Sequence, residues 1–228
     1  MRMRRKKHGP ERIAACSEYL ICPDKDMPGV LHDPSEWFPD RRPVFLEIGC
    51  GKGGFASSYA ASHPECNLIA VERVPDVACL ALEKAKAGRG ERQSDNLRIL
   101  IANAQDLTRL FCEHSFAGIF LNFSDPWPKK GYAKRRLTHR LFLEQYRRLL
   151  SDHGLLYFKT DNEPLFDFSL EEFAAAGLSV EQISRDLHED TSIKDNIMTE
   201  YESNFVSQGK PIFYAKVRFE KDHAGTTD

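Results

Sequence analysis

Short hydrophobic runs alternate with amphipathic stretches through most of the chain, and this rhythm predicts the fold. Runs of strand length, rich in Val, Ile, Leu and Phe, lie at residues 44–48, 67–72, 97–102, 116–121 and 154–160. Stretches with helical spacing of their apolar positions lie between and after them, at residues 55–62, 75–87, 105–110, 137–150 and 163–176. Strands and helices that alternate in this way form a mainly parallel α/β sheet with helices on both of its faces.

The two ends of the chain depart from this rhythm. Near the C-terminus, strands at 178–184 and 211–219 flank a polar segment and a short helix at 199–207, which predicts an antiparallel hairpin at one edge of the sheet. Near the N-terminus we expect a helix at 11–21 and then a connector rich in Pro and Asp. The expected organisation is a basic arm, helix and connector at 1–43, one domain at 44–220 and a flexible tail at 221–228.

Composition narrows the class of protein. The chain has 228 residues, of which 41% are hydrophobic and 29% charged, as in ordinary globular proteins. Its net charge of −2 excludes a surface that is basic all over, so any nucleic acid must bind to a local patch. The six cysteines have neither CxxC pairing nor metal-ligand spacing, so we expect free thiols and no metal. No stretch approaches the roughly 18 apolar residues of a membrane span, and we expect a cytoplasmic location.

A glycine loop follows the first predicted strand. Gly49, Gly51 and Gly54 have the G-x-G-x-x-G spacing, and Glu72 comes about 20 residues later, as in dinucleotide sites. Glycines allow the backbone to approach a ligand closely. Glu47, however, stands inside the strand, where a dinucleotide site has an apolar residue. A carboxylate there repels pyrophosphate and suits a ligand that carries a cationic group.

The ends of the next two strands favour the same kind of ligand. Glu72 ends the second strand and is placed to accept hydrogen bonds from ribose hydroxyls, while Asn103 and Ala104 follow the third strand and are placed to read an adenine edge. An acidic residue, a glycine loop, a second acidic residue and then Asn form the pattern of an S-adenosylmethionine site.

The fourth strand runs into an unusual polar stretch. Asp125 comes four residues after the end of this strand, and then come a stiff Pro126-Trp127-Pro128 corner and a group of cations. Our interpretation is that Asp125 faces a reacting base while the segment behind it contacts a phosphate backbone. The residues expected to contact RNA are Gly131, Tyr132, Ala133, Lys134, Arg135 and Arg136.

From about Phe45 to Phe219 the chain resembles the bacterial tRNA (guanine-N7-)-methyltransferases. The matching motifs are Glu47-Ile48-Gly49-Cys50-Gly51-Lys52-Gly53, Glu72-Arg73, Asn103-Ala104, Phe123-Ser124-Asp125-Pro126-Trp127-Pro128-Lys129, Lys159-Thr160-Asp161 and Thr199-Glu200-Tyr201-Glu202. The Asp-Pro-Trp-Pro-Lys and Thr-x-Tyr-Glu elements are specific to that family, whereas the glycine loop is common to most class I methyltransferases. In one departure, the chain has Gly131-Tyr132 where family members commonly carry Arg-His, although Tyr132 is able to stack on a base.

The resemblance implies a Rossmann-like class I fold with a seven-stranded sheet. It also implies that the chain methylates N7 of a guanine in the tRNA variable loop, at position 46, with S-adenosylmethionine and no metal. We expect a monomer or homodimer. Asp125 is then the expected catalytic residue. The expected cofactor-binding residues are Glu47, Gly49, Gly51, Glu72, Asn103, Ala104 and Asp125, and the expected substrate-binding residues are Lys129, Asp161, Thr199, Glu200, Tyr201 and Glu202.

Alternative interpretations stay open at this point. Glu202 stands three residues after Thr199, so both residues also fit a plain capping box at a helix start. For the whole chain, the rivals are a nicotinamide-dependent oxidoreductase, a methyltransferase acting on an exocyclic amine of another base, and a non-catalytic RNA-binding protein. The first has no use for Glu47 or the cations. The second is suggested by a superficial likeness of the Ser-Asp-Pro-Trp stretch to the motif of those enzymes.

Overall fold

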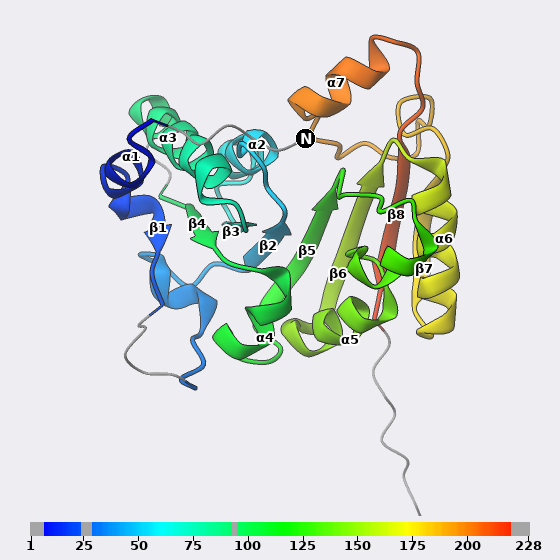
Figure 1. The fold of residues 1–228 in the computed structure, drawn as a ribbon, viewed down its shortest axis with the longest axis horizontal. Helices are drawn as coiled ribbons and strands as arrows, with labels where there is room; N and C mark the ends of the chain where they lie inside the picture. Colours follow the sequence, from blue (N-terminus) through cyan, green and yellow to red (C-terminus); the bar gives the residue numbers. More distant parts are fainter. Residues whose placement is uncertain (1–6, 24–28, 93–94, 220–228) are drawn as a thin grey trace, which may run out of the picture.

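The computed structural model describes residues 7–23, 29–92 and 95–219, which form one mixed sheet flanked by helices (Figure 1). Within these residues the sheet has eight strands in the order β1-β4-β3-β2-β5-β6-β8-β7. The strands are β1 (Leu20–Ile21), β2 (Val44–Ile48), β3 (Asn67–Glu72), β4 (Leu97–Ile101), β5 (Phe116–Asn122), β6 (Leu150–Thr160), β7 (Ser179–Ser184) and β8 (Phe213–Arg218).

Strand directions confirm the predicted fold class. Strands β1 to β6 pair in parallel, whereas β8 lies between β6 and β7 and runs antiparallel to both. The expected seven strands are β2 to β8. A further short strand, β1, lies where we had expected the C-terminal part of a helix at 11–21. That helix was wrong in its extent, because Leu20 and Ile21 pair with β4 instead and Ile21 is buried there.

Helices cover both faces of the sheet. The longer helices lie close to their predicted positions, since each buries an apolar face against the sheet. The α-helices are α1 (Gly9–Ala14), α2 (Gly54–Ser62), α3 (Pro75–Arg92), α4 (Leu107–Leu110), α5 (Arg140–Leu149), α6 (Glu163–Ala175) and α7 (Glu200–Val206). Short 3₁₀ helices are η1 (Ser17–Tyr19), η2 (Pro34–Trp37), η3 (Ala104–Asp106) and η4 (Lys130–Arg135).

The alternation of side chains along β3 shows how the two faces are filled. Leu68 and Ala70 belong to the core under α2 and α3, whereas Ile69 and Val71 belong to the core under α5 and α6. Successive side chains of a strand point to opposite faces, so a strand that is apolar throughout must be covered on both sides. This double burial fixes the register of the central strands, and with it the positions of the loops at their carboxyl ends.

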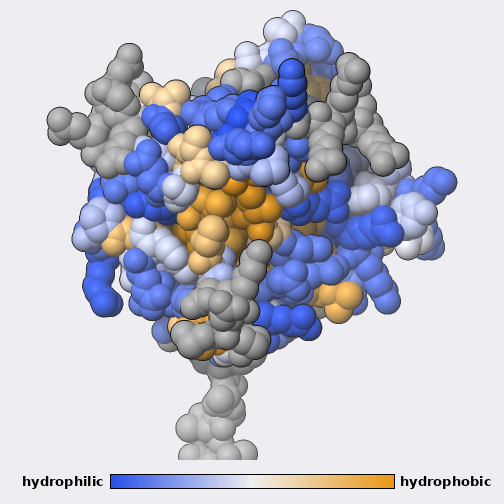
Figure 2. All heavy atoms as spheres, turned by 60° about the vertical axis from the view of Figure 1, so that its left-hand side comes forward, coloured by the Kyte–Doolittle hydropathy of each residue, from blue (hydrophilic) through white to orange (hydrophobic). Residues whose placement is uncertain are grey.

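The carboxyl ends of the parallel strands meet at one edge of the sheet, and α7 lies above the ends of β5 and β6 (Figure 1). On the face shown in Figure 2, hydrophobic residues gather in a central hollow that is surrounded by hydrophilic ones. In open α/β sheets, ligands bind outside the carboxyl ends of the strands. A ligand site is therefore expected at this edge.

Candidate active site

The glycine loop between β2 and α2 presents bare backbone to the edge of the sheet. Gly49, Gly51 and Gly53 have φ values of 84°, 57° and 72°, in the left-handed region that favours glycine. A Cβ added at Gly49 or Gly51 meets no atom within 4 Å, so the loop faces open space there. At Gly53 it lies 2.9 Å from the Cβ of Ala81 in α3, so this glycine is needed for packing of the loop against that helix.

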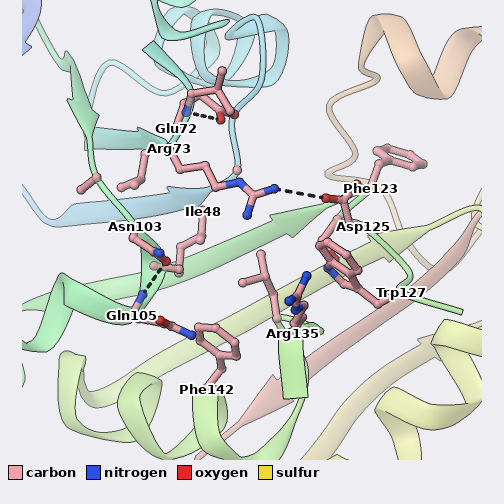
Figure 3. Close-up of a pocket in the computed structure, with 17 residues that line it drawn as sticks. Ile48, Glu72, Arg73, Asn103, Gln105, Phe123, Asp125, Trp127, Arg135 and Phe142 are labelled. Atoms are coloured by element: carbon pink, nitrogen blue, oxygen red, sulfur yellow. Dashed lines mark hydrogen bonds and ion pairs between the residues drawn. The ribbon is translucent and has the colours of Figure 1, made fainter. Parts of the chain in front are cut away.

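Glu72 holds the glycine loop as well as lining the space beside it. Its carboxylate accepts hydrogen bonds from the backbone N–H of Gly51 (3.1 Å) and of Val74 (2.9 Å). Asn103 caps η3, where its Oδ1 accepts from the backbone N–H of Gln105 at 3.2 Å (Figure 3). The ends of β2, β3 and β4 thus form three sides of one cavity.

This cavity has a volume of about 400 Å³, within the range of small-molecule sites. Residues from the ends of β2, β3 and β4, from the loop after β5, and from η4, α5 and the segment between these two helices line it: Ile48, Gly49, Val71, Glu72, Arg73, Val74, Ala102, Asn103, Ala104, Gln105, Phe123, Ser124, Asp125, Trp127, Arg135, Leu137 and Phe142. Ser124 is one of these lining residues, and its buried Oγ has no hydrogen-bond partner among the described residues. Figure 3 shows these side chains around the space.

The structure buries Glu47 and does not include it among the residues that line this cavity. One of its carboxylate oxygens accepts from the side-chain amide of Asn122 at 3.1 Å, and the other has no partner among the described residues. Burial raises the pKa of Glu47 to about 7, against the opposing influence of the Asn122 hydrogen bond and the charge of Lys159. Direct cofactor binding by Glu47 therefore stays a prediction.

The loop after β5 holds Asp125 at the rim of the cavity. The carboxylate is 71% exposed and lies 3.8 Å from the guanidinium of Arg73, which reaches across the cavity from the end of β3 (Figure 3). Phe123 and Trp127 flank Asp125 and have φ values of 52° and 42°, which bulky residues rarely adopt. Such strain, held by the surrounding structure, is common at functional sites.

Arg136 supplies part of the support for this strained loop, a role that sequence reasoning missed. Its guanidinium donates to the backbone carbonyls of Pro126 and Trp127, both at 3.1 Å, and it lies 4.2 Å from the ring centre of Phe168 in α6. Arg136 was expected to contact RNA, but here it clamps the corner that carries Asp125. A cation that stands ten residues after Pro126 gives no local signal of that contact.

The remaining cations of this segment lie in and beside η4. Arg135 lies 4.9 Å from the ring centre of Trp127 and 4.7 Å from that of Tyr132, so the three side chains form one cation–aromatic group at the rim. Lys129, Lys130 and Lys134 are exposed, as are Gly131 and Tyr132, while Ala133 is half-buried. Tyr132 contacts protein side chains on one side, and 42% of it remains exposed.

The start of α7 forms the other side of the rim. The capping box suggested by the sequence is confirmed: the Oγ1 of Thr199 accepts from the backbone N–H of Glu202 at 2.9 Å, and the carboxylate of Glu202 accepts from the N–H of Thr199 at 3.3 Å. Tyr201 is half exposed and its ring centre lies 5.0 Å from that of Phe123. Burial raises the pKa of Tyr201, and the nearby charges of Asp161 and Asp125 raise it further.

Glu202 itself does not face the rim. It is fully buried, and besides the Thr199 N–H its carboxylate binds the side chains of Lys159 (2.7 Å), Asn196 (2.7 Å) and His188 (2.9 Å). Of the expected substrate-binding residues, Lys129, Asp161 and Tyr201 are therefore accessible, and Glu200 is the first residue of α7. The interior role of Glu202 arises from residues up to 43 positions away, which no local pattern reveals.

The described ranges contain neither a membrane-spanning helix nor a ready-made metal centre. In them, no helix combines the length and the apolar character that crossing a membrane requires. Nor does any group of three or more His, Cys, Asp or Glu side chains there have an arrangement that would hold a metal ion.

Comparisons with known proteins agree on a methyltransferase. A protein-family model described as "Putative methyltransferase" matches residues 41–215. A tRNA (guanine-N(7)-)-methyltransferase of Geobacillus sp. (strain WCH70) is 42% identical over 98% of each chain. One from Brevibacillus brevis is 45% identical over 78% of this chain and 81% of the relative. Among solved structures, the 16S rRNA methyltransferase KamB has a TM-score of 0.57 at 14% identity, covering 78% of this chain and 88% of KamB, which confirms the methyltransferase fold.

Proposed function

The chain belongs to the family of the tRNA (guanine-N(7)-)-methyltransferases, and on that premise we propose that it methylates N7 of a guanine in the variable loop of tRNA, at position 46. The methyl donor is S-adenosylmethionine. The observation that carries this proposal is an exposed carboxylate, Asp125, at the rim of a cavity whose opposite wall is the glycine loop. The cations of η4 begin five residues later, in the same loop.

The cavity at the strand ends suits this cofactor. When bound, S-adenosylmethionine supplies an electrophilic methyl group on a cationic sulfur. Gly49 and Gly51 offer bare backbone for close approach, and Glu72 offers a carboxylate on the same wall. Asn103 and Ala104 are the residues that we assign to the adenine edge, and Ser124 adds an unpaired hydroxyl. No metal has a part in this scheme.

The chemistry at N7 defines what Asp125 has to do. Guanine N7 carries a free lone pair, so it needs no deprotonation before it attacks a methyl group. Methylation then leaves positive charge on the purine. A fixed carboxylate stabilises that charge as it develops, and its hydrogen bonds to the N1–H and the 2-amino group hold the base in line. Positioning of this kind contributes roughly 7–11 kcal/mol to lowering a barrier.

The accessible groups around Asp125 are assigned to different parts of the tRNA. We propose that Asp161 and Tyr201 contact the target nucleotide together with Lys129, because all three lie beside or above the Asp125 loop and are not enclosed. Arg135 and Tyr132 form the rim that faces the neighbouring nucleotides, and Lys130 and Lys134 contact phosphates. Thr199 and Glu200 begin the helix that carries Tyr201.

A single assay tests the reaction. The protein is incubated with labelled S-adenosylmethionine and unmodified tRNA, and the methylated nucleoside is identified by mass spectrometry after digestion. We expect 7-methylguanosine, and a tRNA with a variable-loop guanine replaced by adenine should accept no label. Label on an exocyclic amine of adenine or cytosine would replace this proposal by the rival methyltransferase, and cofactor binding without label transfer would replace it by an RNA-binding role.

We also propose an organisation for the chain as a whole. The methyltransferase domain comprises residues 44–220, preceded by a basic arm, helix and connector at 1–43 and followed by a tail at 221–228. Residues 1–6 and 220–228, which include the basic arm and the tail, lie outside the described residues. The protein acts on tRNA in the cytoplasm as a monomer or homodimer.

A further inference from the structure

Lys159 is a buried cation that the proposed chemistry does not use. It is the residue before the last in β6, its side chain is only 5% exposed, and its ammonium group donates to three acceptors. These are the side-chain carbonyl of Asn196 at 2.9 Å, the backbone carbonyl of Ile197 at 2.9 Å and the carboxylate of Glu202 at 2.7 Å. An ammonium has three N–H donors, so all of its hydrogen-bonding capacity is directed to one stretch of chain, from residue 196 to residue 202.

Apolar packing supports this stretch only in part, through the partly buried side chains of Ile193 and Ile197. Residues 192–197 line a second cavity of about 510 Å³. The stacked rings of Phe120 and Tyr157 and the side chain of Lys159 line the same cavity. A segment that lines a cavity lacks the close packing that fixes most loops. The ion pair with Glu202 and the two bonds to residues 196 and 197 therefore hold the segment to the sheet.

The stretch that Lys159 holds leads directly to the reaction site. Glu202 closes the capping box of α7, and Tyr201 lies next to it on the same turn. The ring of Tyr201 contacts Phe123, two residues before Asp125. In Figure 1, α7 lies above the ends of β5 and β6. A chain of contacts thus runs from Lys159 through Glu202 and Tyr201 to the strained loop that carries the catalytic carboxylate.

We propose that Lys159 is a positioning residue for methyl transfer: it holds the start of α7 so that Tyr201 fixes the Asp125 loop and closes the nucleotide side of the site. This inference rests on the proposed function. Lys159 does not line the cofactor cavity. Its ammonium lies 6.0 Å from the ring centre of Phe123, the same ring that Tyr201 contacts, so its effect on the Asp125 loop passes through Tyr201 and Phe123. It should therefore influence turnover much more than cofactor binding.

The test is Lys159→Met, measured at saturating tRNA beside the wild type. We expect kcat to fall roughly 100-fold, as misplacement by about 1 Å can do, with the Kd for S-adenosylmethionine unchanged. On a Tyr201→Ala background the same substitution should cause little further loss, because the two residues act as one unit. The matched control is Arg148→Met, which should leave kcat unchanged. It breaks an ion pair with Glu113, and the two residues stand just before β6 and β5, at the amino ends of these strands.

Three outcomes would overturn the proposal: an unchanged kcat, an equal loss on the Tyr201→Ala background, or a parallel loss of cofactor affinity. If Lys159→Met fails to fold, because it leaves Glu202 buried without its cation, Asn196→Ala removes one acceptor and leaves the ion pair intact. That variant should also lower kcat, and an unaffected kcat would contradict the idea. The rate of hydrogen exchange at the α7 amides measures directly how firmly this helix is held, and we expect it to be faster in either variant than in the wild type. This measurement does not depend on whether the wild type methylates tRNA.

Discussion

The environments of Asp125 and Glu47 give these two carboxylates different roles. Asp125 is 71% exposed at the rim, whereas Glu47 is 2% exposed inside the sheet. An exposed carboxylate beside a cavity is available to a substrate, and a buried one acts on the protein around it. The roles proposed for the two residues can therefore be tested with two different kinds of measurement.

For Asp125 we predict an effect on turnover. Asp125→Asn keeps the shape of the side chain but removes its charge, so it should lower kcat by roughly 100-fold or more, the loss typical when one group that stabilises transition-state charge is removed. The Kd for S-adenosylmethionine should change little. Single-turnover methylation of tRNA and equilibrium cofactor binding measure the two quantities. The control is Arg73→Gln, which removes the ion partner and spares the carboxylate; if it lowers kcat as much as Asp125→Asn, the carboxylate is not the important group.

For Glu47 we predict an effect on stability that depends on pH. Burial raises its pKa from 4.5 to about 7, so between these values the folded protein binds a proton that the unfolded chain does not. Stability from this group is therefore complete below about pH 4.5 and is lost as the pH rises to about 7. Urea unfolding without cofactor should show that, relative to Glu47→Gln, the wild type loses on the order of 2 to 3 kcal/mol between about pH 5 and about pH 8. Parallel pH curves for the two proteins would contradict this.

Among the secondary-structure elements, the sequence predicted those whose pattern is local. The strands β2 to β6 and β8 lie close to the predicted runs, because each run is apolar enough to be buried and is bounded by polar or glycine residues. The strand β7 also lies where it was predicted, although most of its residues are exposed. The strand β1 escaped prediction, since a two-residue strand has no period and exists only because β4 offers it an edge. The capping box of α7 was found because its signal spans only four residues.

The candidate site also contains residues that the sequence located and residues whose roles it did not reveal. Glu72, Asn103 and Asp125 each follow a predicted strand, and parallel topology alone brings such strand ends together. Arg136 and Glu202 were assigned to RNA and substrate, but the structure turns them inward, to the Asp125 loop and to Lys159. Whether a charged residue points inward depends on partners from distant elements. Sequence patterns therefore located the edge where the site lies but not the network that holds it in shape.

For the whole molecule, the distribution of charge matters more than its sum. A net charge of −2 gives no general attraction to RNA, so binding must rely on the exposed cations beside the site. Arg136 does not belong to these exposed cations, because its guanidinium donates hydrogen bonds to the backbone of the Asp125 loop. Lys130 and Lys134 are the exposed lysines of η4 and can be changed without disturbing that clamp. They are therefore the residues with which to test a phosphate-contacting surface.

We predict that Lys130→Ala/Lys134→Ala weakens tRNA binding and reduces the slope of log K against log salt concentration by about 2, one for each phosphate that the variant no longer neutralises. Filter binding or fluorescence anisotropy over a range of salt concentrations measures the slope. The control is Arg109→Ala/Arg148→Ala, which removes the same charge from α4 and α5, away from the proposed RNA surface. If both pairs reduce the slope equally, overall charge and not this surface governs binding. If only the lysine pair does, the phosphate backbone of the tRNA lies against η4, and its target guanine is delivered to the rim that carries Asp125.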